Sequence, residues 1–270
     1  ETIGDAQDFL FFFLYDKLSS KTLAGYTYLG QLIAHDMSYD NSPLQGNSIS
    51  IDNRRTPALD LDSVYGGGPE KSPHLYNEKE GFIFKLIKQH TNDNAAFIKP
   101  YYDFPNSGRI PVLADQRNDE NIILSQLQIV LMLLHNHFIQ ELKKDLSGLD
   151  LFREARQKTV WHYQYVIVTD YLSKILCNKQ LIRISRSSPA PMDFIPLEFA
   201  GAAFRFGHSQ VRPTYQLRPQ TTGRRAIIPD LRYNGLQSCV DWRLFFGDGV
   251  PEEAIDPRHN LRISPILMKG

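Results

Sequence analysis

The chain has 270 residues, of which 42% are hydrophobic, so it is long enough to bury one large core or two small ones. Thirty basic and 30 acidic residues give a formal net charge of zero, so charge provides no argument for binding nucleic acid or an acidic membrane surface. No uninterrupted apolar run approaches the roughly 20 residues that cross a bilayer, so we expect no transmembrane segment. The 2 cysteines suffice neither for a disulfide framework nor for a metal knuckle, and the compartment stays open.

Residues 8–18 are densely aromatic and are expected to lie against a larger body. The first helix is predicted over residues 22–37. Three apolar residues carry its i, i+3, i+4 spacing: Leu29, Leu32 and Ile33. Gln31 and His35 are four apart and share another face, whereas Asp36, about 100° further round, must point elsewhere. For this stretch alone, a partly buried histidine hydrogen-bonded inside a helix is the simpler explanation.

Residues 40–54 are polar and predict a loop. In the segment after them, oxygen-bearing groups alternate along the chain in a way that suits a metal ion. Every second position offers a side-chain or backbone oxygen, at Thr56, Ala58, Asp60 and Asp62. In an extended loop this alternation would bring the oxygens to one side, which is the chemistry of a Ca²⁺ site. An ordinary acidic turn explains the same residues without a metal.

The remainder predicts a mainly α-helical protein with long loops and little sheet. Residues 70–112 are irregular and suit a long surface excursion. Apolar patterns predict helices over residues 122–142 and 151–176 and near 196–211. Asp119 and Glu120 precede the first of these helices, where the helix dipole is a sufficient reason for acidic residues.

Four segments, taken in order, resemble the animal-type haem peroxidases (the peroxidase–cyclooxygenase superfamily). They are Gly-Gln-Leu-Ile-Ala-His-Asp at 30–36, the oxygen-rich loop at 56–66, Asp-Gln-Arg-Asn-Asp-Glu at 115–120 and Ala-Phe-Arg-Phe-Gly-His-Ser at 203–209. Leu-His-Asn-His-Phe at 134–138 and Glu-Ala-Arg-Gln at 154–157 also resemble helices of that family. In this light His135 is a packing residue, because positions i and i+2 of a helix diverge and His135 and His137 cannot share a metal.

The resemblance implies a haem b cofactor held between two histidines. His208 would be the proximal ligand of the haem iron, and His35 the distal base that takes a proton from hydrogen peroxide and returns it to the leaving oxygen. Arg117 would stabilise the negative charge that develops as the O–O bond breaks, and Gln31 would orient water or a halide. A surface arginine in a polar loop is the alternative explanation of Arg117.

The resemblance also implies a structural Ca²⁺ that fixes the distal helix. Its ligands would be Asp36, Thr56, the Ala58 carbonyl, Asp60 and Asp62.

Departures from the family pattern limit the haem linkage. Many relatives attach haem by two ester bonds, but Ala34 stands at the aspartate position, so at most one ester can form, through Glu120. Asn121 excludes the sulfonium link of one subgroup. Arg205, near the haem by resemblance, stands where cyclooxygenase-like relatives have a radical-forming tyrosine, which favours peroxidase chemistry.

We therefore predict a haem peroxidase that reduces H₂O₂ and oxidises a small donor (halide, pseudohalide or phenol) through a high-valent state of the haem. A haem-dependent fatty-acid oxygenase and a non-catalytic haem-binding or adhesion module are the alternatives. We expect a single catalytic domain over 1–270 that is a segment of a longer protein, because the asparagine and arginine that accompany the proximal histidine in the family lie beyond this sequence. The resemblance favours a secreted or extracytoplasmic location.

Overall fold

The computed structural model describes residues 22–39, 53–89, 101–176 except 109, 195–217 except 202, 212, 213 and 216, 225–226 and 240–247. The expectations for residues 8–18 and for most of the 40–54 loop lie outside these ranges. The described part is mainly helical, as expected, and its strands are all short.

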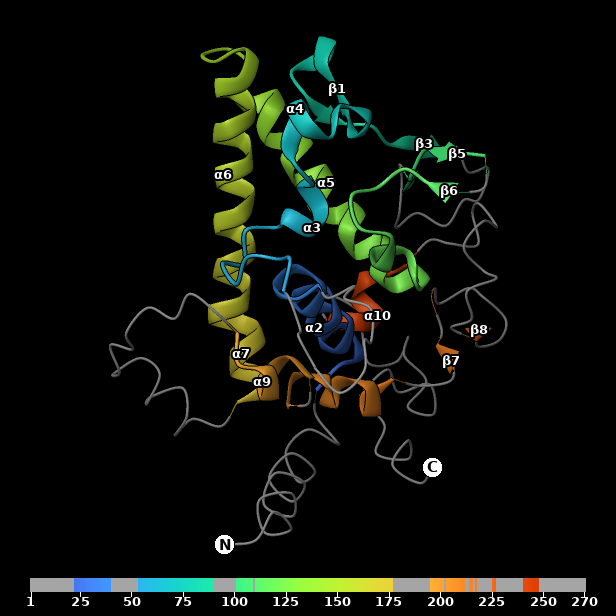
Figure 1. Ribbon diagram of the computed structural model, residues 1–270. Helices are drawn as coiled ribbons and strands as arrows, with labels where there is room; N and C mark the ends of the chain where they lie inside the picture. Colours follow the sequence, from blue (N-terminus) through green and yellow to red (C-terminus); the bar gives the residue numbers. More distant parts are fainter. Residues whose placement is uncertain are drawn as a thin grey trace, which may run out of the picture.

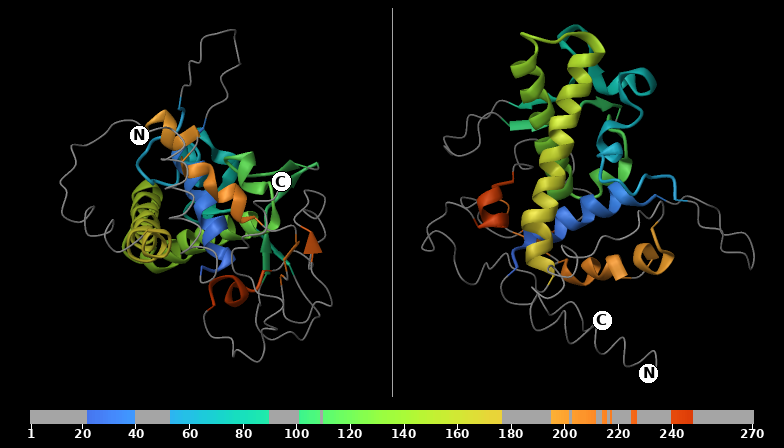
Figure 2. Two further views of the ribbon diagram at one scale, coloured as in Figure 1. Left: turned by 90° about the horizontal axis from the view of Figure 1, so that it is seen from below. Right: turned by 90° about the vertical axis from the view of Figure 1, so that its left-hand side faces the viewer.

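The frame consists of α2 (Ala24–Met37), α5 (Ile122–Leu142) and α6 (Gly148–Val166). Helices α5 and α6 form an antiparallel pair, and α2 crosses beside them near the lower end of α6 (Figures 1 and 2). Beyond Val166 the chain continues through a π-helical turn, Ile167–Tyr171, into α7 (Leu172–Ile175). The helix predicted over 151–176 is therefore confirmed, but the π-helical turn within it was not predicted from the sequence.

Helix α2 is buried around most of its circumference, which suits a helix at the centre of a large core. It approaches the π-helical turn closely at Gly30. A Cβ atom placed on Gly30 would lie 2.6 Å from the Tyr171 hydroxyl oxygen, so this contact requires a residue without a side chain. Ser38 ends the helix by donating its backbone N–H and its hydroxyl to the Ala34 carbonyl, at 3.0 and 2.7 Å.

Helix α5 begins at a well-formed cap, where the Asn121 side chain accepts the backbone N–H of Leu124 at 2.9 Å. The helix is long and apolar enough to span a membrane by length and composition, but 67% of its most apolar window is buried inside the fold. Its His135 lies in an aromatic cluster and contacts the Tyr65 hydroxyl at 3.1 Å, which confirms the packing role expected for it.

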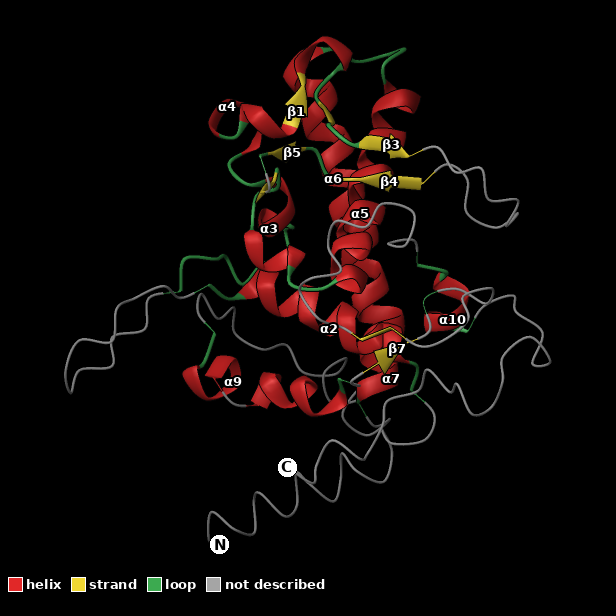
Figure 3. Ribbon diagram, turned by 90° about the vertical axis from the view of Figure 1, so that its right-hand side faces the viewer, coloured by secondary structure: helices red, strands yellow, loops and turns green. Residues whose placement is uncertain are grey.

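Short elements fill the stretch between α2 and α5. They are α3 (Asp62–Tyr65), α4 (Gly68–Lys71), the 3₁₀ turns η1 (Pro73–Leu75), η2 (Glu78–Glu80) and η3 (Gln116–Asp119), and the strands β1 (Tyr76–Asn77), β2 (Ile83–Phe84), β3 (Ile87–Gln89), β4 (Tyr101–Asp103), β5 (Asn106–Ser107) and β6 (Ile110–Pro111). The strands pair antiparallel as β1–β2, β3–β4 and β5–β6, with Tyr76 opposite Phe84, Lys88 opposite Tyr102 and Asn106 opposite Pro111. Figure 3 shows these ladders gathered at the end of the molecule away from α9.

The described C-terminal part comprises α9 (Leu197–Gly201), η5 (Ala203–Gln210), β7 (Thr214–Tyr215), β8 (Arg225–Ala226) and α10 (Trp242–Phe246). β7 and β8 pair antiparallel, with Thr214 opposite Ala226. Helices α9 and η5 together replace the single helix predicted near 196–211. η5 runs alongside α2 (Figure 2), and the hydroxyl of Thr27 in α2 donates to Gln210 of η5 at 3.4 Å.

Candidate active site

The last turn of α2 carries two adjacent polar side chains that face different surroundings. The His35 imidazole contacts Asn118 of η3, and the Asp36 carboxylate accepts hydrogen bonds from Leu61 and Ser63 at the start of α3. This is the separation expected from the 100° between successive helical positions. One helix end therefore positions both the candidate base and a candidate cation ligand.

His35 is buried, with 9% of its surface exposed, and its Nδ1 lies 2.8 Å from the Asn118 side-chain oxygen. Burial lowers the pKa of His35 from its ordinary value to about 4, although the Asn118 hydrogen bond partly offsets this. The imidazole is therefore neutral at neutral pH, as a general base must be. Among the described residues, Nε2 has no hydrogen-bond partner.

Gln31, one turn before His35, belongs to a small polar cluster with the residues before α5. Its amide nitrogen donates to the carboxylate of the exposed Glu120 at 3.0 Å, and its oxygen accepts from Asn121 at 3.1 Å. Gln31 and Glu120, the candidate haem-linking residue, are thus brought together from distant parts of the sequence.

Arg117 holds the end of α2. Its Nη1 donates to the Ser38 carbonyl at 2.8 Å and its Nη2 to the His35 carbonyl at 2.9 Å, so the guanidinium satisfies oxygens that the helix leaves open. It also pairs with Asp115 at 2.6 Å and lies over the Tyr39 ring. Arg117 therefore contacts His35 at the main-chain carbonyl of His35 and not at the imidazole.

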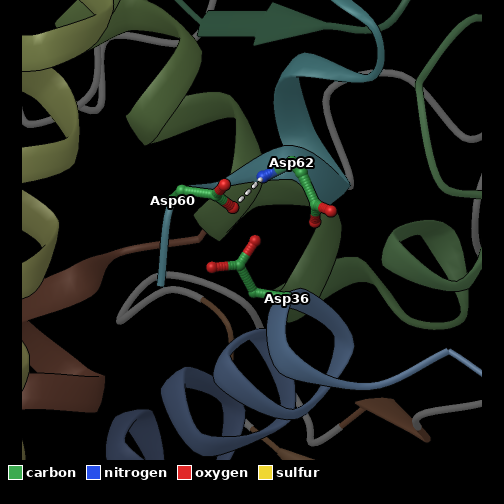
Figure 4. Close-up of side chains that lie close together, drawn as sticks. All are labelled: Asp36, Asp60 and Asp62. Atoms are coloured by element: carbon green, nitrogen blue, oxygen red, sulfur yellow. Dashed lines mark hydrogen bonds between the residues drawn. The ribbon is translucent and has the colours of Figure 1, made fainter. Parts of the chain in front are cut away.

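Three carboxylates from two segments converge beside α2 (Figure 4). One ligand oxygen from each of Asp36, Asp60 and Asp62 lies within 4.8 Å of the others. Burial raises the pKa of Asp36 to about 6, opposed by the Leu61 N–H and reinforced by the Asp62 charge. Leu61 has a left-handed backbone, with φ of 59°, and a fully buried side chain, so core packing maintains a conformation that leucine otherwise disfavours.

Helix α6 binds the backbone oxygens of the same loop. Gln164 donates to the carbonyls of Ala58 and Leu59, each at 3.3 Å, and Arg156 donates to the Asp60 carbonyl at 3.4 Å. The Ala58 carbonyl, expected to face a cation, thus already accepts a hydrogen bond. Thr56 is exposed, and its backbone N–H lies close enough to Asp62 to lower that carboxyl's pKa against the dominant effect of burial.

Arg55 and Asp115 join the carboxylate cluster to Arg117, and sequence reasoning missed both. Arg55 lies 3.4 Å from Asp62 and 2.5 Å from Asp115, which in turn pairs with Arg117. Burial raises the pKa of Asp115, but the hydrogen bonds and charges of Arg117 and Arg55 outweigh it and hold the pKa below its ordinary value. The adjacency of Arg55 to the oxygen-rich loop was the available signal.

His208 lies on η5, beside α2. Its Nδ1 lies 2.8 Å from the Arg205 carbonyl, and Nε2 has no hydrogen-bond partner among the described residues. The side chain is exposed. Arg205 is also exposed, and its Nε donates to the Ala200 carbonyl at 3.1 Å.

The donor set fits a haem iron. A ligating histidine usually donates Nδ1–H to a protein oxygen and binds metal through Nε2, and His208 has this arrangement. His35 has the same arrangement on the neighbouring element, with Asn118 as the accepting group. Two histidines of this kind, on helical elements that pack against each other, offer the imidazole ligands that a haem iron takes.

Comparison with known proteins gives the family. The profile of the animal haem peroxidases matches residues 32–235, which includes His35, Arg117 and His208. The chain therefore belongs to the animal haem peroxidase family. The resemblance drawn from the separate motifs is confirmed.

Individual relatives are distant. The chain is 30% identical to a peroxidase-like protein of Margaritifera margaritifera over 59% of this chain and 22% of the relative. It is 30% identical to the chorion peroxidase of Drosophila melanogaster over 58% of this chain and 22% of that one, and 26% identical to mouse thyroid peroxidase over 81% and 26%. The chain thus spans about a quarter or less of these relatives.

Solved structures agree on the fold. Peroxidase A from Dictyostelium discoideum superposes with a TM-score of 0.57 at 15% identity, covering 82% of this chain and 55% of that one. A fatty acid alpha-dioxygenase of Oryza sativa gives 0.53 at 17% identity, covering 82% and 49%. Peroxidase and dioxygenase chemistry therefore occur on the same fold.

Proposed function

We propose that this chain carries the distal and proximal residues of a haem peroxidase that reduces H₂O₂ and oxidises a halide, pseudohalide or phenolic donor. The observation that carries the proposal is the neutral, buried His35, whose Nε2 has no hydrogen-bond partner in the described part of the chain. Its helix packs against the element that bears His208. Family membership supports it.

Each residue has a defined task in this mechanism. Haem would supply the iron that delivers electrons to the O–O bond. His208 would hold the iron through Nε2, while His35 accepts a proton from peroxide at Nε2 and returns it to the departing oxygen. Gln31 would orient the incoming molecule, and Glu120 would form the one possible ester to haem. Arg117 would act on developing charge with the one Nη1 hydrogen left free by its bonds to α2 and Asp115.

The test uses the haem-loaded chain with H₂O₂ and, in turn, guaiacol, bromide or an unsaturated fatty acid. We expect oxidation of guaiacol or bromide, and about a 100-fold or greater loss of turnover in His35→Leu, since general acid–base groups contribute ~10²–10⁴. His162→Ala is the matched control, because among the described residues the hydrogen-bond partner of that exposed imidazole is the Lys158 carbonyl of its own helix.

A fatty-acid oxygenase is the second candidate, favoured by the structural similarity to the rice dioxygenase. Product formation from the fatty acid alone would establish it and overturn the first proposal. A haem spectrum that no substrate changes would instead favour a haem-binding module without turnover.

We also propose that Asp36, Asp60 and Asp62, with Thr56 and the Ala58 carbonyl, hold a Ca²⁺ that fixes the end of α2. The grouping of the three carboxylates around buried Asp36 supports this. The Ala58 carbonyl would use its second lone pair, because Gln164 already donates to it. Exhaustive chelation should lower turnover by loosening His35, and an unchanged haem spectrum and turnover after chelation would contradict the assignment.

A further inference from the structure

Asn118 is a buried residue whose side chain has one hydrogen-bond partner among the described residues, and that partner is the candidate base. The residue is 0% exposed, and its oxygen lies 2.8 Å from Nδ1 of His35. Its amide nitrogen is buried without a hydrogen-bond partner among the described residues. A buried amide left half unsatisfied costs stability, so its retention calls for a reason.

Its position is fixed by the backbone of η3. The Asn118 N–H donates to the Asp115 carbonyl at 3.0 Å, and the Asp115 side chain accepts the backbone N–H of Arg117 at 3.1 Å. The neighbouring Arg117 binds the main-chain oxygen of His35 while Asn118 binds its ring. One short turn therefore holds both the backbone and the imidazole of the same histidine.

The chemistry of the contact selects a tautomer. A neutral imidazole has one N–H, and the oxygen of Asn118 can only accept, so the hydrogen belongs on Nδ1 and the lone pair on Nε2. With the hydrogen on Nε2, two lone pairs would face each other across 2.8 Å, and the atom directed away from Asn118 would be unable to take a proton.

We propose that Asn118 is a positioning residue that locks His35 in the Nδ1–H tautomer and thereby makes Nε2 the proton acceptor. The catalytic consequence rests on the proposed peroxidase function, whereas the tautomer is a property of the chain itself. Asn118 acts only through His35 and touches neither peroxide nor donor.

The first measurement is the ¹⁵N spectrum of the His35 ring in the chain without haem, in the parent and in Asn118→Leu and Asn118→Asp. The parent and Asn118→Asp, whose carboxylate only accepts, should show a protonated Nδ1 and a bare Nε2. Asn118→Leu, or Asn118→Ala if leucine prevents folding, should shift toward the Nε2–H tautomer. An Nε2–H tautomer in the parent, or an unchanged spectrum in the acceptor-free variant that folds, would overturn the proposal.

The second measurement uses haem-loaded protein. Without an acceptor at position 118, kcat/KM for H₂O₂ should fall about 10- to 100-fold, a part of what a general base contributes. kcat/KM for guaiacol should stay within about twofold, because the donor reacts after the proton transfers. Asn118→Asp should restore the peroxide step, which a purely structural role would not predict.

Gln128→Leu is the matched control. Gln128 is a fully buried amide on α5 whose Nε2 has the Met132 sulfur, at 3.7 Å, as its one hydrogen-bond partner among the described residues, so its loss should leave both the His35 spectrum and the peroxide step unchanged. A parent protein that binds haem but does not consume peroxide would refute the proposed function alone, since the ring spectrum still decides the tautomer. Equal losses on both kcat/KM values in the acceptor-free variants would refute the positioning role alone.

Discussion

Replacing Asp36 with asparagine is expected to stabilise the ion-free protein at pH 7.5 by about 2 kcal/mol. Burial raises the pKa of Asp36 from 3.8 to about 6, which at ~1.4 kcal/mol per unit makes the ionised carboxylate cost about 3 kcal/mol. Because the folded-state pKa lies above the unfolded one, this cost is absent at pH values below the unfolded pKa. It grows as the pH rises from about 4 to 6, and it is complete above that range.

Asparagine removes the charge and retains most of the contacts. Its oxygen can accept the Leu61 N–H, which lies 3.1 Å from the Asp36 carboxylate, and its amide can donate to the Ser63 hydroxyl at 3.2 Å. Of the hydrogen bonds from Leu61 and Ser63, the long one from the Ser63 N–H, at 3.4 Å, is lost, for about 1 kcal/mol. The net gain is therefore about 2 kcal/mol at pH 7.5 and close to zero near pH 4.

Urea unfolding in excess chelator, at both pH values, measures this difference directly. In millimolar Ca²⁺ the order should reverse, since the parent gains binding free energy that the variant lacks. Asp150→Asn is the control, because that exposed carboxylate pairs, within the described part of the chain, with Arg153 on the same helix. A variant no more stable than the parent at pH 7.5 in chelator would refute the burial cost assigned to Asp36.

Further outcomes follow from other contacts. Gly30→Ala should destabilise the fold by about 1–3 kcal/mol through overpacking against the Tyr171 hydroxyl, and Tyr171→Phe in the same chain should recover part of that loss in urea unfolding. Burial lowers the pKa of His135 to about 4, below its unfolded value, so acid favours the unfolded parent chain. Between pH 7 and 4.5, His135→Phe should therefore lose about 2.5 kcal/mol less free energy of unfolding than the parent. A stability difference between the two proteins that does not change with pH would contradict this. Arg117→Met should cost about 2–4 kcal/mol by leaving buried Asp115 with one cation fewer, measured by thermal unfolding, whereas a loss under 1 kcal/mol would show that Arg55 suffices.

Helical periodicity predicted the frame and the division of labour at the end of α2. The spacing of Gln31, His35 and Asp36 fixes their relative directions before any tertiary contact is known. The alternation of Asp60 and Asp62 likewise predicted that both carboxylates face one side, and they do lie together with Asp36.

The contacts of Arg117 and Asn118 were beyond reach of the sequence. Both depend on how η3 meets α2, and the partners are about 80 positions apart. A local sequence pattern does not predict how two distant segments pack together. Arg117 was therefore expected to face the reacting molecule and not the carbonyls of α2. The left-handed backbone of Leu61 was also not predictable from the sequence. Glycine or asparagine normally adopts this conformation, whereas here core packing imposes it on leucine.

The π-helical turn at Ile167–Tyr171 shifts the phase of the long helix. In a regular α-helix, Tyr171 would lie about 80° round from Tyr163, whereas one additional residue in a wide turn brings it back to within about 20°. Tyr163 and Tyr171 are both buried, on the side of the helix that faces the core. Deleting one residue from the turn would rotate Tyr171 off the backbone of Gly30. The glycine in one helix and the added residue in the other are therefore a matched pair, and a chain with a regular helix here would have no need for glycine at position 30.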